Sequence, residues 1–142
     1  MSFWDSSAIV PLCLYEANSQ NARRLWRRPV SKYIAWFTPV EVMSAFARSE
    51  RTGEITDQRR LVAEKLLQII ESRFELIHSE PRIVALARTF PSIYGLRSLD
   101  SLQLAAALVW CKEFPKDKDF ISADAKLLES AKSVGFTIHD LS

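Results

Sequence analysis

The sequence predicts an α/β fold: a three-layer sandwich with a short, mainly parallel five-stranded sheet and helices on both faces. Short apolar runs rich in β-forming residues alternate along the chain with longer segments of helical periodicity. Such alternation favours parallel strands that are joined by right-handed helical crossovers. The chain has 142 residues, of which 48% are hydrophobic, and no linker-like stretch divides it. We therefore expect residues 1–142 to form one domain.

The expected elements follow from these patterns in chain order. Strands are predicted at Ser2–Trp4, Tyr33–Phe37, Phe74–Ile77, Phe120–Ile121 and Phe136–Ile138. Helices are predicted at Ala8–Tyr15, Ser19–Trp26, Val40–Arg51, Asp57–Glu71, Pro81–Thr89, Leu99–Trp110 and Ala125–Ser133. The helix Asp57–Glu71 has the clearest pattern, because its leucines and isoleucines recur at helical spacing opposite charged side chains. In a parallel sheet of this kind, the ligand is expected beyond the carboxyl ends of the strands.

The composition excludes several classes of function. Three glycines are too few for a glycine-rich phosphate loop, and the two cysteines and two histidines show no zinc-binding spacing. We expect Cys13 and Cys111 to be reduced core residues. The longest apolar run, Leu104–Trp110, is far shorter than the ~20 residues that span a bilayer, and Asp5 interrupts the start of the chain. We therefore expect a cytoplasmic protein with no membrane partner.

Four acidic residues stand at the predicted ligand edge. Asp5 ends the first strand, Asp124 follows the fourth, and Glu41 and Asp100 begin helices. Carboxylates that are held close together repel one another, and a divalent cation removes that cost. Oxygen ligands suit Mg²⁺ or Mn²⁺, which would activate a water for attack on a phosphodiester.

Helix capping offers another explanation for each acid taken singly. Thr38-Pro39-Val40-Glu41 has the form of a capping box with proline at the first helical position. Ser98 can cap the helix that carries Asp100, while Asp5 and Asp124 are ordinary cap residues. Capping does not explain, however, why these acids occur at the particular helix N-termini that lie at the predicted ligand edge.

These motifs resemble the PIN-domain family, and within it the small VapC-type toxins of type II toxin–antitoxin pairs. The stretches that carry the resemblance are Asp5-Ser6-Ser7, Val40-Glu41-Val42 with Ala47-Arg48, Leu99-Asp100-Ser101 through Ala107, and Phe120-Ile121-Ser122-Ala123-Asp124. The resemblance implies an endoribonuclease that hydrolyses RNA with Mg²⁺ or Mn²⁺, with Asp5, Glu41, Asp100 and Asp124 as its catalytic, metal-binding residues. It also places Ser7 and Ser122 beside the metal, and implies a homodimer and a cognate antitoxin. No second acid closely follows Asp124, so the resemblance leaves the number of metals open.

Other features leave alternatives open. Arg97 either contacts RNA phosphate or pairs with one of the four carboxylates, and arginines near Trp26 and at Arg48–Arg60 either bind RNA or form solvated helix faces. The main alternative function is a non-catalytic PIN-like module that binds RNA or protein. A receiver-like signalling domain would need a pair of adjacent acids after the first strand, where Asp5 stands alone. A serine hydrolase built on Ser6 or Ser7 with His139 and Asp140 lacks the required nucleophile elbow.

Overall fold

The computed structural model describes all residues from 1 to 142 and contains five strands and eight helices. The strands are β1 (Ser2–Trp4), β2 (Lys32–Ala35), β3 (Glu75–Ile77), β4 (Asp119–Ser122) and β5 (Thr137–Asp140). The helices are α1 (Ser6–Cys13), α2 (Ser19–Trp26), α3 (Thr38–Arg51), α4 (Asp57–Glu71), α5 (Pro81–Ala87), α6 (Phe90–Tyr94), α7 (Ser98–Trp110) and α8 (Ala125–Val134). Every strand pair is parallel.

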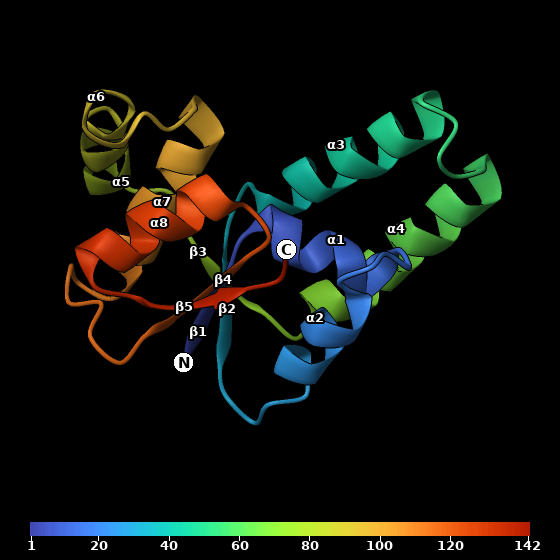
Figure 1. Ribbon diagram of the computed structural model, residues 1–142, viewed down its shortest axis with the longest axis horizontal. Helices are drawn as coiled ribbons and strands as arrows, with labels where there is room; N and C mark the ends of the chain where they lie inside the picture. Colours follow the sequence, from blue (N-terminus) through green and yellow to red (C-terminus); the bar gives the residue numbers. More distant parts are fainter.

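The strands lie in the order β3-β2-β1-β4-β5, so β1 is central (Figure 1). The chain moves outward from β1 through β2 to β3, and then returns to place β4 on the other side of β1. The register pairs Phe3 with Tyr33 on one side and with Phe120 on the other. The strand order therefore reverses between β1 and β4, and such a switch point opens a crevice at the carboxyl ends of the two strands.

Helices cover both faces of the sheet, which confirms the predicted three-layer sandwich. In Figure 1, α1 to α4 lie on the right of the sheet and α5 to α8 on the left. Successive strand residues face opposite sides. Phe3 accordingly packs in the core beneath α5 to α8, whereas Trp4 packs in the core beneath α1 to α4. Both side chains are fully buried, and each face therefore has its own apolar core.

The element boundaries differ from the predicted ones where local turns compete with the apolar pattern. The strand expected at Tyr33–Phe37 ends at Ala35, because Trp36 and Phe37 form a turn and α3 begins at Thr38. The short helix α6 was not expected. It has Pro91 in its first turn and ends at Tyr94, and it is capped by Gly95, whose φ of 65° is the left-handed conformation that glycine adopts readily.

Helices α3 and α4 pack against each other and project from the sheet on the right of Figure 1. Neither these nor any other helix combines the length and the apolar character needed to cross a bilayer. Cys13 is buried, Cys111 is half-buried, and both are free thiols.

Candidate functional site

The candidate site lies at the switch point between β1 and β4. Asp5 comes directly after β1, and its backbone N–H donates to the carbonyl of Ile121 in β4 at 3.2 Å. Asp124 follows β4 after one intervening residue and immediately precedes α8. The fold therefore brings these two acids to the crevice that the strand order creates, as predicted.

Asp5 is almost completely buried, with only 2% of its surface exposed. Desolvation by burial raises the pKa of its carboxyl to about 7, and the nearby charge of Glu41 acts in the same direction. Asp5 precedes α1 but its side chain accepts no capping hydrogen bond from that helix. Helix capping therefore does not account for the burial of this carboxyl.

Two serines connect Asp5 to the end of β4. The Ser7 hydroxyl donates to Oδ1 of Asp5 at 2.8 Å and accepts from the backbone N–H of Ala123 at 2.8 Å. Its oxygen also lies 3.2 Å from the hydroxyl of Ser122, which accepts from the backbone N–H of Asp124 at 2.9 Å. Since Ser7 gives its own proton to Asp5, Ser122 is the donor between the two hydroxyls.

Glu41 lies in the first turn of α3 and is held by two side chains from other helices. Gln103 of α7 donates to its Oε1 at 2.7 Å, and Ser6 of α1 donates to its Oε2 at 3.4 Å. Burial raises the pKa of Glu41, the bond from Gln103 lowers it, and the charge of Asp100 raises it. The predicted capping box is wrong, because Thr38 is itself helical and buried, and its hydroxyl accepts from Gln103.

Asp100 is half-buried in the first turn of α7. Burial and the neighbouring charge of Asp124 raise its pKa, while Arg97 and Lys126 lower it. Arg97 occupies the cap position of α7 without a capping side chain, and Ser98 is already helical. The prediction that Ser98 caps this helix is therefore wrong.

Asp124 does cap a helix. Its Oδ1 accepts from the backbone N–H of Leu127 at 2.9 Å at the start of α8. The capping prediction is confirmed for this residue, and its second carboxylate oxygen forms no hydrogen bond within the protein. Asp124 therefore combines a local structural role with a carboxylate oxygen at the crevice.

Electrostatic coupling joins the four acids in a series: Asp5 with Glu41, Glu41 with Asp100, and Asp100 with Asp124. None of the four forms an ion pair with a lysine or arginine. No group of three or more acids, histidines or cysteines forms a ready-made metal site. Mg²⁺ typically needs only one or two carboxylates, together with waters and substrate oxygens. The unneutralised acids therefore suit a divalent cation.

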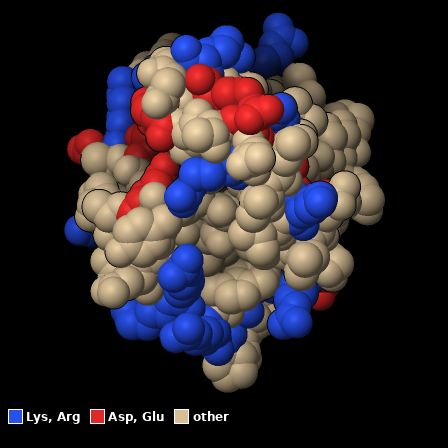
Figure 2. Space-filling model, turned by 90° about the vertical axis from the view of Figure 1, so that its right-hand side faces the viewer, with Lys and Arg blue, Asp and Glu red and all other residues tan.

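A cleft of about 510 Å³ is lined by Glu41, the only one of the four acids in its wall, together with Ser7 and Ala123. It continues along α3 to Arg48, which is the only lysine or arginine in its lining. Figure 2 shows the face that carries the projecting helices, with acidic side chains gathered in its upper part and basic ones around them and below.

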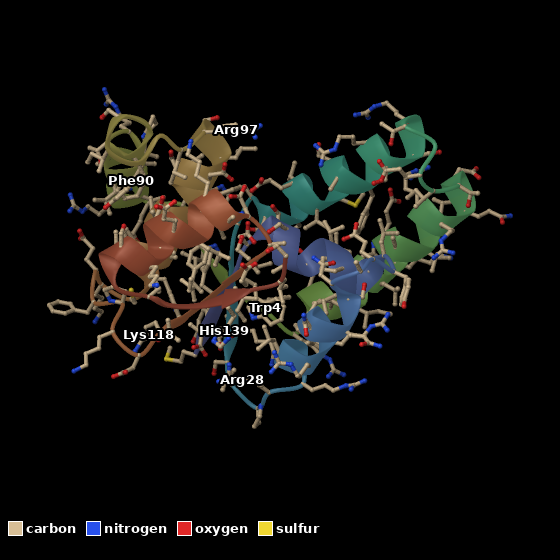
Figure 3. All side chains as sticks on the ribbon, in the orientation of Figure 1. Trp4, Arg28, Phe90, Arg97, Lys118 and His139 are labelled. Atoms are coloured by element: carbon tan, nitrogen blue, oxygen red, sulfur yellow. The ribbon has the colours of Figure 1, made fainter.

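The basic residues that the sequence singled out have different roles. Arg60 pairs with Glu50 and Glu64, and Arg28 pairs with Asp119. Arg97 is exposed and forms no ion pair, and Figure 3 shows it at the start of α7, near the acidic crevice. It therefore stays available for a phosphate while still lowering the pKa of Asp100.

His139 has no part in this site. Its Nε2 lies 2.9 Å from Asp119, at the opposite end of β4 from Asp124 (Figure 3). The hydroxyl of Ser7 instead bonds to Asp5, Ala123 and Ser122. No serine–histidine pair exists here, and the serine-hydrolase alternative is wrong.

Gln103 and Ser6 contact Glu41 but were not among the predicted site residues. The signal for Gln103 was present in the sequence, as a polar amide within the apolar stretch Leu102–Leu108. Ser6 gave no comparable signal, because serine is common where a helix begins.

Comparison with known proteins places the chain among characterised folds. The model of the PIN domain family matches residues 3–126. No curated protein sequence matches the chain. A toxin–antitoxin complex from Klebsiella pneumoniae is similar in structure, with a TM-score of 0.68 at 16% identity over 100% of this chain and 98% of that one.

Two further solved structures share the fold. VapC20 of Mycobacterium tuberculosis, a toxin that cleaves the sarcin–ricin loop, gives a TM-score of 0.68 at 15% identity and covers 96% of this chain and 97% of its own. A protein from Pyrobaculum aerophilum gives a TM-score of 0.66 at 20% identity over 96% of this chain and 87% of its own. At these identities the likeness is one of fold.

Proposed function

We propose that this chain, which belongs to the PIN-domain family, is a metal-dependent endoribonuclease. The observation that carries the proposal is the position of Asp5 and Asp124 at the β1/β4 switch point, where they are coupled electrostatically in series with Glu41 and Asp100 and have no balancing ion pair. Family membership also disfavours the receiver-like alternative, which the lone acid after β1 already opposed. Residues 1–142 act as one domain in this proposal.

In this proposal Asp5, Glu41, Asp100 and Asp124 hold Mg²⁺ or Mn²⁺. A bound ion of this kind supplies a reactive hydroxide from water and neutralises charge on the phosphate. Ser7 fixes the carboxylate of Asp5 through its 2.8 Å hydrogen bond, and Ser122 fixes Ser7. Arg97 attracts an RNA phosphate to the acidic centre. These groups hold the phosphodiester beside the four acids, which is the arrangement that hydrolysis requires.

The biological setting that we propose is a toxin of a toxin–antitoxin pair, acting in the cytoplasm as a homodimer and inhibited by a cognate antitoxin. Similar structures include complexes of that kind from Klebsiella pneumoniae and Rickettsia felis. The projecting α3 and α4 expose apolar side chains on which a protein partner could pack, including Val40, Val62 and Ile69.

The test is cleavage of RNA by purified, chelator-stripped protein. We expect Mn²⁺ or Mg²⁺ to produce discrete RNA fragments, EDTA to abolish them, and the folded variants Asp5→Asn and Asp100→Asn to produce none. Cleavage that persists at the wild-type rate in both variants would reject the four acids as the active site.

The second candidate is a PIN-like module that binds RNA or protein without catalysis. It is favoured by the absence of a ready-made site formed by three or more metal-binding side chains. RNA binding that needs no metal, together with the absence of cleavage under every metal condition, would support this alternative.

A further inference from the structure

Gln103 is a buried amide in an apolar part of α7. Only 1% of its surface is exposed, and the residues that follow it, Leu104 to Leu108, all belong to the core beneath α5 to α8. It lies one helical turn after Asp100. Burial of a primary amide is unfavourable unless its polar atoms find partners.

The amide of Gln103 is only half-satisfied. Its Nε2 donates to Oε1 of Glu41 at 2.7 Å and to the hydroxyl of Thr38 at 3.1 Å. Its Oε1 is buried and has no hydrogen-bond partner. The nitrogen faces Glu41 because an ionised carboxylate can only accept, so a flipped amide would place two acceptors together.

Leucine or methionine would fill this space without leaving an oxygen unpaired. A buried polar group with an unpaired atom lowers stability, and such groups are typical of functional sites, where their role in function offsets that cost. The contact that its nitrogen makes with Glu41 is shorter than the 3.4 Å contact from Ser6. Gln103 is therefore the principal group that fixes the direction of the Glu41 carboxylate.

We infer that Gln103 is a positioning residue, which holds the Glu41 carboxylate in the orientation needed to bind the divalent cation. This inference rests on the proposed function. Partners that orient a metal ligand typically contribute 10- to 100-fold to metal affinity. Gln103 acts only through Glu41, since none of its hydrogen bonds reaches Asp5, Asp100 or Asp124.

The experiment is a double-mutant cycle on Mn²⁺ affinity, measured by calorimetry on the chelator-stripped full chain. Gln103→Met preserves volume and removes the donor, and we expect it to weaken Mn²⁺ binding by about tenfold. In the Glu41→Gln background the same substitution should have no further effect. Ser101→Ala is the matched control, because Ser101 is equally buried on the same helix and its hydroxyl oxygen has no partner.

Circular dichroism establishes that each variant is folded. If Gln103→Met does not fold, Gln103→Asn takes its place, because it keeps the amide but is too short to reach Glu41. If the wild type binds Mn²⁺ and the Gln103 variant binds it with the same affinity, the inference is wrong but the proposed metal centre stands. The inference is also wrong if the Gln103 substitution lowers Mn²⁺ affinity by the same factor in the wild-type and Glu41→Gln backgrounds, because its effect would then not depend on Glu41. Absence of Mn²⁺ binding by the wild type overturns the inference together with the proposed metal centre.

Discussion

Ser7 donates a 2.8 Å hydrogen bond to Asp5, so a hydroxyl from the first turn of α1 fixes a carboxylate at the end of β1. We expect Ser7→Ala to lower Mn²⁺ affinity by about 10- to 100-fold, because Asp5 then loses its orienting donor. Calorimetric titration measures this loss. Ser133→Ala is a suitable control, because that hydroxyl bonds only to a backbone carbonyl within α8. Wild-type affinity in Ser7→Ala would contradict the role assigned to Ser7.

The stability of the metal-free protein should fall as pH rises from about 4 to 7. Burial raises the pKa of Asp5 from 3.8 to about 7, so within this range the folded state keeps a proton that the unfolded chain has lost. The slope from this one group is at most about 1.4 kcal/mol per pH unit. Glu41 and Asp100, whose pKa values are also raised, act with the same sign.

Urea unfolding of chelator-stripped protein between pH 4 and pH 7 measures this dependence, with Asp5→Asn for comparison. The variant should show a flatter profile than the wild type. A wild-type free energy of unfolding that increases with pH over this range would be inconsistent with a buried, unpaired Asp5.

Asp100→Asn should stabilise the metal-free protein while abolishing RNA cleavage. Burial and the charge of Asp124 disfavour the ionised form of Asp100, so removal of its charge should add roughly 0.5–2 kcal/mol to the free energy of unfolding. Thermal unfolding after chelation measures the change. Asp57→Asn serves as the control, because Asp57 is an exposed acid in the first turn of α4. This variant should be slightly less stable than the wild type, since it loses a favourable interaction with the helix dipole. A less stable Asp100→Asn would argue against repulsion at this site.

Substitutions at Asp124 can separate its cap from its charge. Asparagine caps helices about as well as aspartate, so Asp124→Asn should remain within about 0.5 kcal/mol of the wild type while it loses activity. Asp124→Ala should lose activity and about 1 kcal/mol of stability as well, because Leu127 N–H loses its acceptor. Chemical unfolding and RNA cleavage distinguish the two effects. Retained cleavage in Asp124→Asn would leave only the capping role.

Arg97→Ala should weaken RNA binding and make it less sensitive to salt. Loss of one phosphate contact lowers the slope of log K against log salt by about 0.7–1. Arg82→Ala is the control, because Arg82 is exposed like Arg97 but is already paired with Glu113 on both carboxylate oxygens. Binding measured by fluorescence anisotropy at several salt concentrations gives the slope. Identical slopes in the two variants would exclude a phosphate contact at Arg97.

The architecture could be predicted from the sequence because the alternation of strands and helices determines the layers. Phe3 and Trp4 are an example. Neighbouring apolar residues in a strand point to opposite faces, so this pair predicts a sheet with an apolar core on each face, as the structure has. The acids at the ends of β1 and β4 were predictable for the same reason. Their positions depend on where the strands end.

The side-chain network could not be predicted from local patterns. Thr38 has the sequence context of a helix cap, yet its hydroxyl accepts from Gln103, far away in the chain. Local rules describe contacts within a few residues, whereas this contact exists only after α3 and α7 have met. Asp124 was predicted correctly as a cap because its partner, Leu127, lies within the same turn.

The pairing of Ser2 in β1 with Asp119 in β4 also has a consequence for protein synthesis. During translation β1 emerges first, but its neighbour on that side emerges only after most of the other elements. A nascent chain that stops before Asp119 lacks both β4 and Asp124. The crevice between β1 and β4 therefore forms only after β2, β3 and all seven helices from α1 to α7 have been synthesised.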